Sequence, residues 1–200
     1  FIILSLLGGI LAVYFTLLVT RMKRLFSNIS NNFIRVNLGA VAVGLLIYFF
    51  PSLYGDSYHG LKEVLSEPLS VPNISLFLLV FITVLKPLAA SLTLGAGGDG
   101  GVFAPSIVAG ASLGLVVAFV GNHYFGAHLI PINFALVGAA ATLSASLFAP
   151  FTSLILICSL LPNGYALFVP ILLGSFIAYF FSKKLLPYNA YSYEFYLAKK

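Results

Sequence analysis

Charge is scarce in this sequence: only 8% of its 200 residues are Asp, Glu, Lys or Arg, whereas 60% are hydrophobic. Soluble globular domains carry about a quarter charged residues, so this chain has too few to cover a surface that faces water. The sequence therefore predicts an integral membrane protein surrounded by lipid. The net charge of +5 does not indicate nucleic-acid binding, because the basic residues lie between apolar runs and form no stripe on a polar domain.

Cysteine and methionine occur once each, as Cys158 and Met22. A single cysteine excludes a disulfide within the chain, and its place in an apolar run is typical of a small core residue. Because Met22 is the only methionine and Phe1 already lies inside an apolar segment, we expect a piece of a longer protein with further membrane segments upstream.

Apolar runs long enough to cross a membrane follow one another along the chain. The hydrocarbon core is ~30 Å thick and takes about 20 helical residues. The expected spans are residues 1–20, 33–50, 74–94 with an interruption at Lys86-Pro87, and 102–120. From 129 to 182 no residue is formally charged, and breaks at Pro150 and 162–164 predict shorter helices near 134–147, 150–161 and 165–182.

The polar segments between these runs carry most of the charge. Basic residues follow the first run (Arg21, Lys23, Arg24) and the last run (Lys183, Lys184, Lys199, Lys200), and the positive-inside rule assigns both places to cytoplasmic ends. Residues 52–72 predict a loop and a short amphipathic helix at the opposite face. Short helices that end at Gly or Pro at membrane depth are typical of transporters. We therefore expect an all-α, polytopic membrane protein with broken and re-entrant helices.

The most informative stretch is residues 95–105, GAGGDGGVFAP. Gly95, Gly97 and Gly100 match the G-x-G-x-x-G spacing of dinucleotide sites, but that fingerprint requires a preceding strand and an acid about 20 residues further on. Neither is present, since the preceding run is a membrane helix. Asp99 beside glycines suggests an intramembrane aspartyl protease, whose chemistry needs two carboxylates. Asp99 is the only acid within this membrane half.

The same stretch fits an anion site built from backbone groups. Glycines let a ligand approach the main chain closely, and Pro105 suits the first turn of a helix. A helix that begins near Ala104 would present free N–H groups around Val102 and Phe103. The helix macrodipole adds about half a positive charge at that end, so a buried helix N-terminus attracts an anion without a formal cation.

Close helix packing is the alternative role of the glycines, because small residues mediate helix contacts in membranes. Gly110 and Gly114, one turn apart in the next predicted helix, are typical of such a contact. From the residues alone, both roles stay open for the stretch before Val102. A helix-tip site would have one advantage for transport, since backbone dipoles bind an anion and still release it.

The segment Gly101-Val102-Phe103-Ala104-Pro105 resembles the GxFxP anion-site motif of the CLC family of chloride channels and chloride/proton antiporters. Three further blocks resemble that family in the same order: residues 54–65, residues 136–152, and Ala190-Tyr191-Ser192 ahead of a basic tail. The resemblance covers nearly the whole chain. It implies that residues 1–200 are the C-terminal half of a CLC-type transmembrane domain, one half of its inverted repeat.

The resemblance also implies which residues bind the ion. The amides near the glycine stretch would bind chloride, and a tyrosine hydroxyl would reach it from the intracellular side. The implied anion-binding residues are Gly101, Val102, Phe103, Ala104, Pro105 and Tyr191. Tyr188 is the alternative tyrosine, and Tyr193 and Tyr196 are predicted to belong to an interfacial aromatic belt. Asp99 stands where the family has a small residue or proline, so we expect it to cap the helix or to lie outside the ion path.

The implied function is passive or proton-coupled transport of chloride, or a similar small anion, by a multi-pass protein of the cell membrane. The resemblance further implies a homodimer, with no metal, no cofactor and no enzymatic activity. Voltage-gated channel and antiporter both stay open, because the family's gating and proton glutamates fall outside this chain. Another broken-helix secondary transporter, using Thr93 and Ser106, is the first alternative. An intramembrane enzyme is the second, although Ser144 and Ser146 share their predicted helix with no histidine base.

Overall fold

The computed structural model describes residues 1–54, 76–160 and 164–199, and within that part the chain is helical and has no strand. The elements are α1 (Ile2–Ser27), α2 (Asn32–Phe49), η1 (Pro51–Leu53), α4 (Leu76–Ala96), α5 (Phe103–Phe125), α6 (Pro131–Leu147), α7 (Pro150–Leu160), η2 (Gly164–Leu167), α8 (Phe168–Leu185) and α9 (Tyr193–Ala198). Five of the described segments are long and apolar enough to cross a membrane: α1, α2, α4, α5 and η2 with α8. The predicted all-α membrane fold is confirmed.

Two helices extend beyond the predicted spans. The first continues through the basic segment to Ser27, because the residues after Thr20 include good helix formers and neither glycine nor proline. The fourth predicted span continues past Val120 to Phe125. It ends at Gly126, which adopts the left-handed conformation (φ 57°) and donates its N–H to the Gly121 carbonyl. The polar turn predicted for residues 121–128 therefore begins later, because residues 121–125 belong to the helix.

The expected interruption at Lys86-Pro87 is wrong, because α4 is one continuous helix with Pro87 inside it. Proline removes one backbone donor from a helix, and packed membrane helices tolerate this loss because neighbouring groups satisfy the backbone. Both residues are buried. The amphipathic helix expected within residues 52–72 and the turn at residues 162–163 lie outside the described residues.

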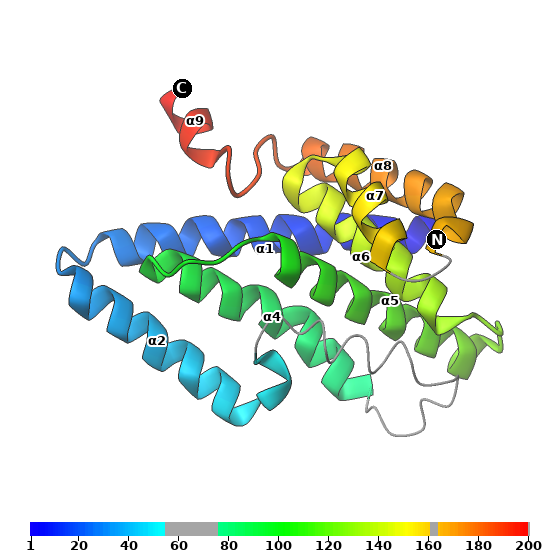
Figure 1. Cartoon of the computed structure of the whole chain (residues 1–200), viewed down its shortest axis with the longest axis horizontal. Coiled ribbons are helices and arrows are strands. Elements are labelled where there is room, and N and C mark those ends of the chain that lie inside the picture. The colour runs from blue at the N-terminus through cyan, green and yellow to red at the C-terminus, as the bar shows by residue number, and fades with distance from the viewer. Residues whose placement is uncertain (55–75, 161–163, 200) are drawn as a thin grey trace.

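Helix α6 lies at the centre of the arrangement and packs against α1, α5, α7 and α8. Every residue from Ala135 to Ser146 is buried, and a helix buried on all sides is expected only where other helices surround it. Figure 1 shows α1 along the length of the molecule, with α4 and α5 beside it, α6 to α8 toward one end and α2 toward the other. Because α6 is packed on every side, it fixes the position of α5.

The contact between α5 and α6 depends on glycine. A Cβ atom on Gly114 would meet the Phe134 carbonyl oxygen and lie 2.8 Å from the Ala135 Cα, and one on Gly110 would meet the Gly138 carbonyl oxygen. Backbone cannot move aside as a flexible side chain can, so these glycines allow the two helices to approach closely. The packing role predicted for Gly110 and Gly114 is confirmed.

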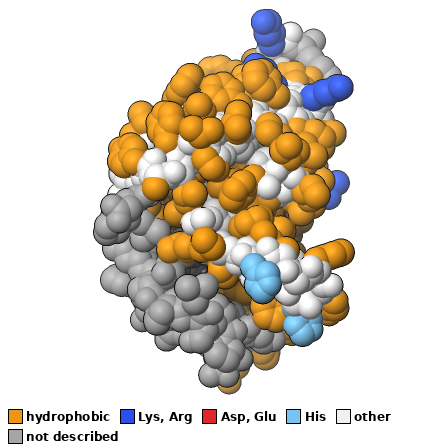
Figure 2. Space-filling model, turned by 90° about the vertical axis from the view of Figure 1, so that its right-hand side faces the viewer, with side chains coloured by type: hydrophobic (Ala, Val, Ile, Leu, Met, Phe, Trp, Pro, Cys, Tyr) orange, Lys and Arg blue, Asp and Glu red, His pale blue; other side chains and the backbone are white. Residues whose placement is uncertain are grey.

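The molecular surface is poor in charge, as the composition predicted. Figure 2 shows hydrophobic side chains over most of the described part of one face, with lysine and arginine side chains at its edge. Such a surface suits contact with lipid or with other membrane segments. The chain is an integral, multi-pass membrane protein.

Candidate anion-binding site

A glycine-rich loop, residues 97–102, connects the end of α4 to the start of α5. Gly97 adopts a φ of 91°, which favours glycine, and the Gly98 N–H donates to the Thr93 carbonyl at 2.9 Å. These two features turn the chain sharply away from α4. Val102 then packs in a cluster with Phe15 and Val19 of α1, so α5 begins beside the middle of a membrane-spanning helix.

The first turn of α5 has no side-chain cap. The Ser106 N–H donates to the Val102 carbonyl and begins the helical pattern, whereas the N–H groups of Phe103 and Ala104 have no acceptor among the described residues. Pro105 has no N–H to satisfy. The helix therefore presents two free amides and the positive end of its macrodipole at one place, one residue earlier than the predicted start near Ala104.

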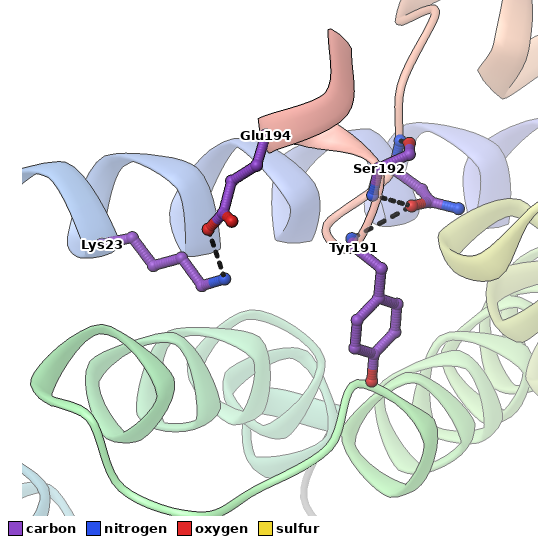
Figure 3. Close-up of polar contacts among 5 residues, drawn as sticks. Lys23, Tyr191, Ser192 and Glu194 are labelled. Carbon is purple, nitrogen blue, oxygen red and sulfur yellow. Dashed lines mark hydrogen bonds and ion pairs between the residues drawn. The ribbon is translucent and has the colours of Figure 1, made fainter. Parts of the chain in front are cut away.

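The tyrosine predicted from the resemblance lies at the same tip. The Tyr191 hydroxyl accepts a hydrogen bond from the Val102 N–H at 3.2 Å, and Figure 3 shows its ring pointing toward the start of α5. Tyr188 lies elsewhere, with its ring 5.1 Å from that of Tyr193 and 5.0 Å from that of Tyr196. The structure thus brings Tyr191, and not Tyr188, to the predicted site.

A cavity of about 430 Å³ opens at the tip of α5. Its wall includes Gly100, Gly101, Phe103, Ala104 and Pro105, together with residues of α2 and α4. Five of these wall residues thus come from the loop and the first turn of α5, and the structure leaves room in front of them. The cavity is large enough for a hydrated anion, because one water takes about 30 Å³ of liquid volume.

Sequence reasoning missed Lys86 as a site residue. It lines the same cavity, is only 5% exposed, and donates from Nζ to the Leu53 carbonyl at 2.9 Å. A charged side chain inside a membrane helix is costly and usually functional. The signal was present in the sequence, since Lys86 is the only formally charged residue between residues 74 and 98.

Asp99 does not cap α5, because the start of that helix has no side-chain cap, so the first of the two expectations for Asp99 is wrong. Its residue is exposed, and no cation of the described residues lies within ion-pair distance of it. The nearby loop residue Gly97 lies against the Arg35 guanidinium, where an added Cβ would meet Nη2 at 3.3 Å. The exposed Asp99 side chain therefore takes no part in capping the start of α5.

The described residues contain no group of three His, Cys, Asp or Glu side chains that would hold a metal ion. The serines considered for an enzyme are packed between helices, since Ser144 Oγ donates to the Ser175 carbonyl at 2.8 Å and Ser146 is fully buried. The Ser144 hydroxyl is bound to a backbone carbonyl and not to a side-chain base. Among the described residues, neither it nor the Lys23–Glu194 pair forms a nucleophile with an adjacent base.

Short apolar helices such as α6 and α7, together with an uncapped helix N-terminus at the start of α5, are typical of membrane transport proteins. Comparison with known sequences agrees: residues 1–183 match the profile of the voltage gated chloride channel family. The chain belongs to this family of channels and antiporters.

Individual relatives are similar over most of this chain. Chloride channel protein CLC-f of Arabidopsis thaliana is 29% identical over 86% of the chain, and the H(+)/Cl(-) exchange transporter ClcA of Klebsiella pneumoniae is 30% identical over 86%. A putative chloride channel protein, ClcB-like, of Ralstonia nicotianae is 32% identical over 73%. The chain spans 23%, 37% and 33% of the lengths of these three proteins, respectively.

Two solved structures share the fold. A CLC-type fluoride/proton antiporter superposes with a TM-score of 0.76 over 95% of this chain and 44% of its own, and a eukaryotic CLC transporter with 0.78 over 96% and 33%. Both are 23% identical to the chain. The likeness establishes the arrangement of the helices.

Proposed function

We propose that residues 1–200 form the C-terminal half of a CLC-type transmembrane domain that transports chloride or a similar small anion across a membrane. The transport is passive or coupled to protons, and it requires no bound cofactor. The relatives named as chloride channels and as an H(+)/Cl(-) exchange transporter support both modes. The protein is a transporter and not an enzyme.

One observation carries the proposal: the first turn of α5, whose Phe103 and Ala104 amides have no acceptor among the described residues, lines a cavity, and the Tyr191 hydroxyl lies at the adjoining Val102 amide. The N–H groups of Phe103 and Ala104 and the helix macrodipole attract an anion there. The Tyr191 oxygen accepts from the Val102 N–H, and its own O–H remains available to donate to the anion. Because none of these groups is a formal cation, the site binds the ion weakly enough to release it.

Lys86 supports the same function from the wall of the cavity. Its side chain is almost fully buried, so water screens it less than it would a surface lysine. A basic side chain in the wall favours anions over cations near the site. In this proposal Lys86 attracts the anion to the cavity, and the amides of α5 bind it.

A sodium-coupled carrier with the same broken helices is the competing function. Such a site needs acids or hydroxyls around unwound backbone. Thr93 lines the cavity, but its hydroxyl donates to the Ala89 carbonyl at 3.1 Å, and Ser106 is fully buried within α5. The described cavity wall contains a lysine and no acid, which favours an anion over a cation.

We also propose that the protein forms a homodimer through α7 and α8. These helices expose large apolar side chains, among them Phe151, Ile155, Val169, Leu173 and Phe180, and the family resemblance supports a dimer contact in this region. A cysteine in place of Ile155 should cross-link two copies in the membrane. A single-copy protein at every detergent concentration would contradict the dimer.

The transport proposal is tested by measuring chloride efflux from liposomes that contain the full-length protein. We expect efflux that saturates with chloride concentration, and a linked change of internal pH if protons are coupled. Efflux no faster than from protein-free liposomes would contradict the proposal. A sodium gradient that drives uptake of an organic solute would favour the competing carrier.

A further inference from the structure

A short turn after α8 carries the tyrosine of the site, and one side chain organises it. Asn189 Oδ1 accepts hydrogen bonds from the Tyr191 N–H at 3.0 Å and from the Ser192 N–H at 2.8 Å. In return, Ser192 Oγ accepts from the Asn189 N–H at 2.9 Å. Asn side chains stabilise turns in this way because they bind backbone two and three residues further on. The backbone of Tyr191 is therefore held from its N-terminal side.

The other end of the same amide joins the turn to the protein core. Asn189 Nδ2 donates to the Leu147 carbonyl at 2.9 Å. Leu147 is the last residue of α6, and the last carbonyls of a helix lack partners within the helix. Between these contacts, Ala190 packs into the cluster of Phe15, Val19 and Val102. The turn is thus tied to the central helix and to the start of α5.

We propose that Asn189 is a positioning residue for anion transport: it holds Tyr191 so that its hydroxyl reaches the Val102 amide at the tip of α5. The effect on transport rests on the proposed function. The positioning of Tyr191 rests on the three hydrogen bonds of the Asn189 side chain. Asn189 itself does not touch the anion and acts only through Tyr191.

Contacts on the far side of Tyr191 offer a matched control. Glu194 pairs with Lys23 of α1 at 3.7 Å, with 78% of the glutamate side chain exposed, and Figure 3 shows this pair beside Tyr191 and Ser192. An exposed ion pair contributes little to stability. Glu194→Gln changes the same segment of the chain, yet leaves every hydrogen bond of Asn189 intact.

Two variants separate the roles of the asparagine side chain. Asn189→Asp keeps the acceptor for the Tyr191 and Ser192 amides, but it replaces the donor to Leu147 with a second oxygen that repels that carbonyl. Asn189→Ala removes all three hydrogen bonds. If anchoring to α6 matters, Asn189→Asp should behave more like Asn189→Ala than like the unchanged protein.

The test measures the chloride KM and the maximal rate in liposomes for the unchanged protein, Asn189→Ala, Asn189→Asp, Tyr191→Phe, Asn189→Ala/Tyr191→Phe and Glu194→Gln. We expect Tyr191→Phe and Asn189→Ala each to raise KM about fivefold, the loss of one hydrogen bond, with the maximal rate within about twofold. Asn189→Ala should add nothing in the Tyr191→Phe background, because it acts through that hydroxyl. Glu194→Gln should leave both constants unchanged.

Additive effects of Asn189→Ala and Tyr191→Phe would overturn the inference, and so would an unchanged KM in folded Asn189→Ala. Hydrogen exchange at the Val102 amide gives a readout independent of flux: Asn189→Ala and Asn189→Asp should accelerate it, and Glu194→Gln should not. Unaltered exchange in both Asn189 variants would also overturn it. Absence of chloride flux from the unchanged protein would instead contradict the proposed function.

Discussion

Glycine acts in two opposite ways in helix α5, one along the body of the helix and one just before its start. Along its body, Gly110 and Gly114 lie against the backbone of α6 so closely that no Cβ fits. Just before its start, an added Cβ on Gly101 would meet only the Phe103 nitrogen, at 3.8 Å. The first pair removes space so that two helices pack, and Gly101 preserves space in front of an amide. A glycine in the sequence therefore indicates that another group comes close to the backbone. The neighbouring atoms in the structure show whether that group is a second helix or a ligand.

The largest effect is expected in the body of α5, where it packs against α6. Gly114→Ala puts a methyl group into the Phe134 carbonyl oxygen, and overpacking of this kind costs about 3 kcal/mol of unfolding free energy or more. We expect the purified variant to lose its cooperative thermal transition in detergent. If Gly114→Ala were as stable to heat as the unchanged protein, the contact between α5 and α6 could relax. Gly114 would then not be needed for close packing of the two helices.

The next largest effect, a loss of chloride affinity without loss of the fold, is expected just before the start of α5. Gly101→Val places its side chain where the anion approaches the Phe103 amide, so chloride affinity should fall at least about tenfold, as for a lost hydrogen bond to a charged group. Gly44→Val is the matched control, because an added Cβ there meets nothing within 4 Å and Gly44 does not line the cavity. Calorimetric chloride titration measures both variants, and equal affinities of Gly101→Val and Gly44→Val would contradict the site.

A smaller effect is expected from the charge in the cavity wall. Lys86→Met should reduce chloride flux about fivefold at low ionic strength, while Lys86→Arg keeps the charge and most of the flux. The reduction should persist in high salt, because salt screens a buried charge much less than an exposed one. Loss of flux in Lys86→Arg equal to that in Lys86→Met would assign the residue to packing. Thermal unfolding of both variants provides the control for the lost hydrogen bond to Leu53.

The smallest effect is expected at Asp99, whose carboxylate is exposed. Asp99→Asn removes a negative charge near the ion path and should raise chloride affinity by less than about twofold, because exposed charges are well screened. The gain should vanish at high ionic strength. A tenfold gain would place the carboxylate inside the ion path and contradict its position in the structure.

The fold was largely predictable from the sequence, because apolar length specifies membrane helices directly. The breaks at Pro150 and near residue 164 and the start of α5 near Pro105 followed from the turn and helix-start preferences of proline. The continuous α4 was not predictable, since whether a proline interrupts a helix depends on its neighbours in space. The extensions to Ser27 and Phe125 are not predictable from apolar length, because a helix can continue through polar residues beyond the hydrocarbon core.

The site was predictable in part. The motif around Phe103 and the choice of Tyr191 came from a resemblance, and the hydrogen bond from the Val102 amide supports that choice. Lys86 was visible as a lone charge, yet only the fold places it on the wall of the same cavity. The contact of Asn189 with the end of α6 joins residues 42 positions apart, and no local pattern predicts a pairing of that range.

We propose that the backbone at the start of α5 binds the anion. Anomalous scattering of bromide, in crystals of the protein grown with bromide in place of chloride, locates the bound ion directly. We expect a peak within hydrogen-bond distance of the Phe103 amide and the Tyr191 hydroxyl, absent in Gly101→Val. A cavity with no peak at that tip, or with bromide only beside Lys86, would contradict it.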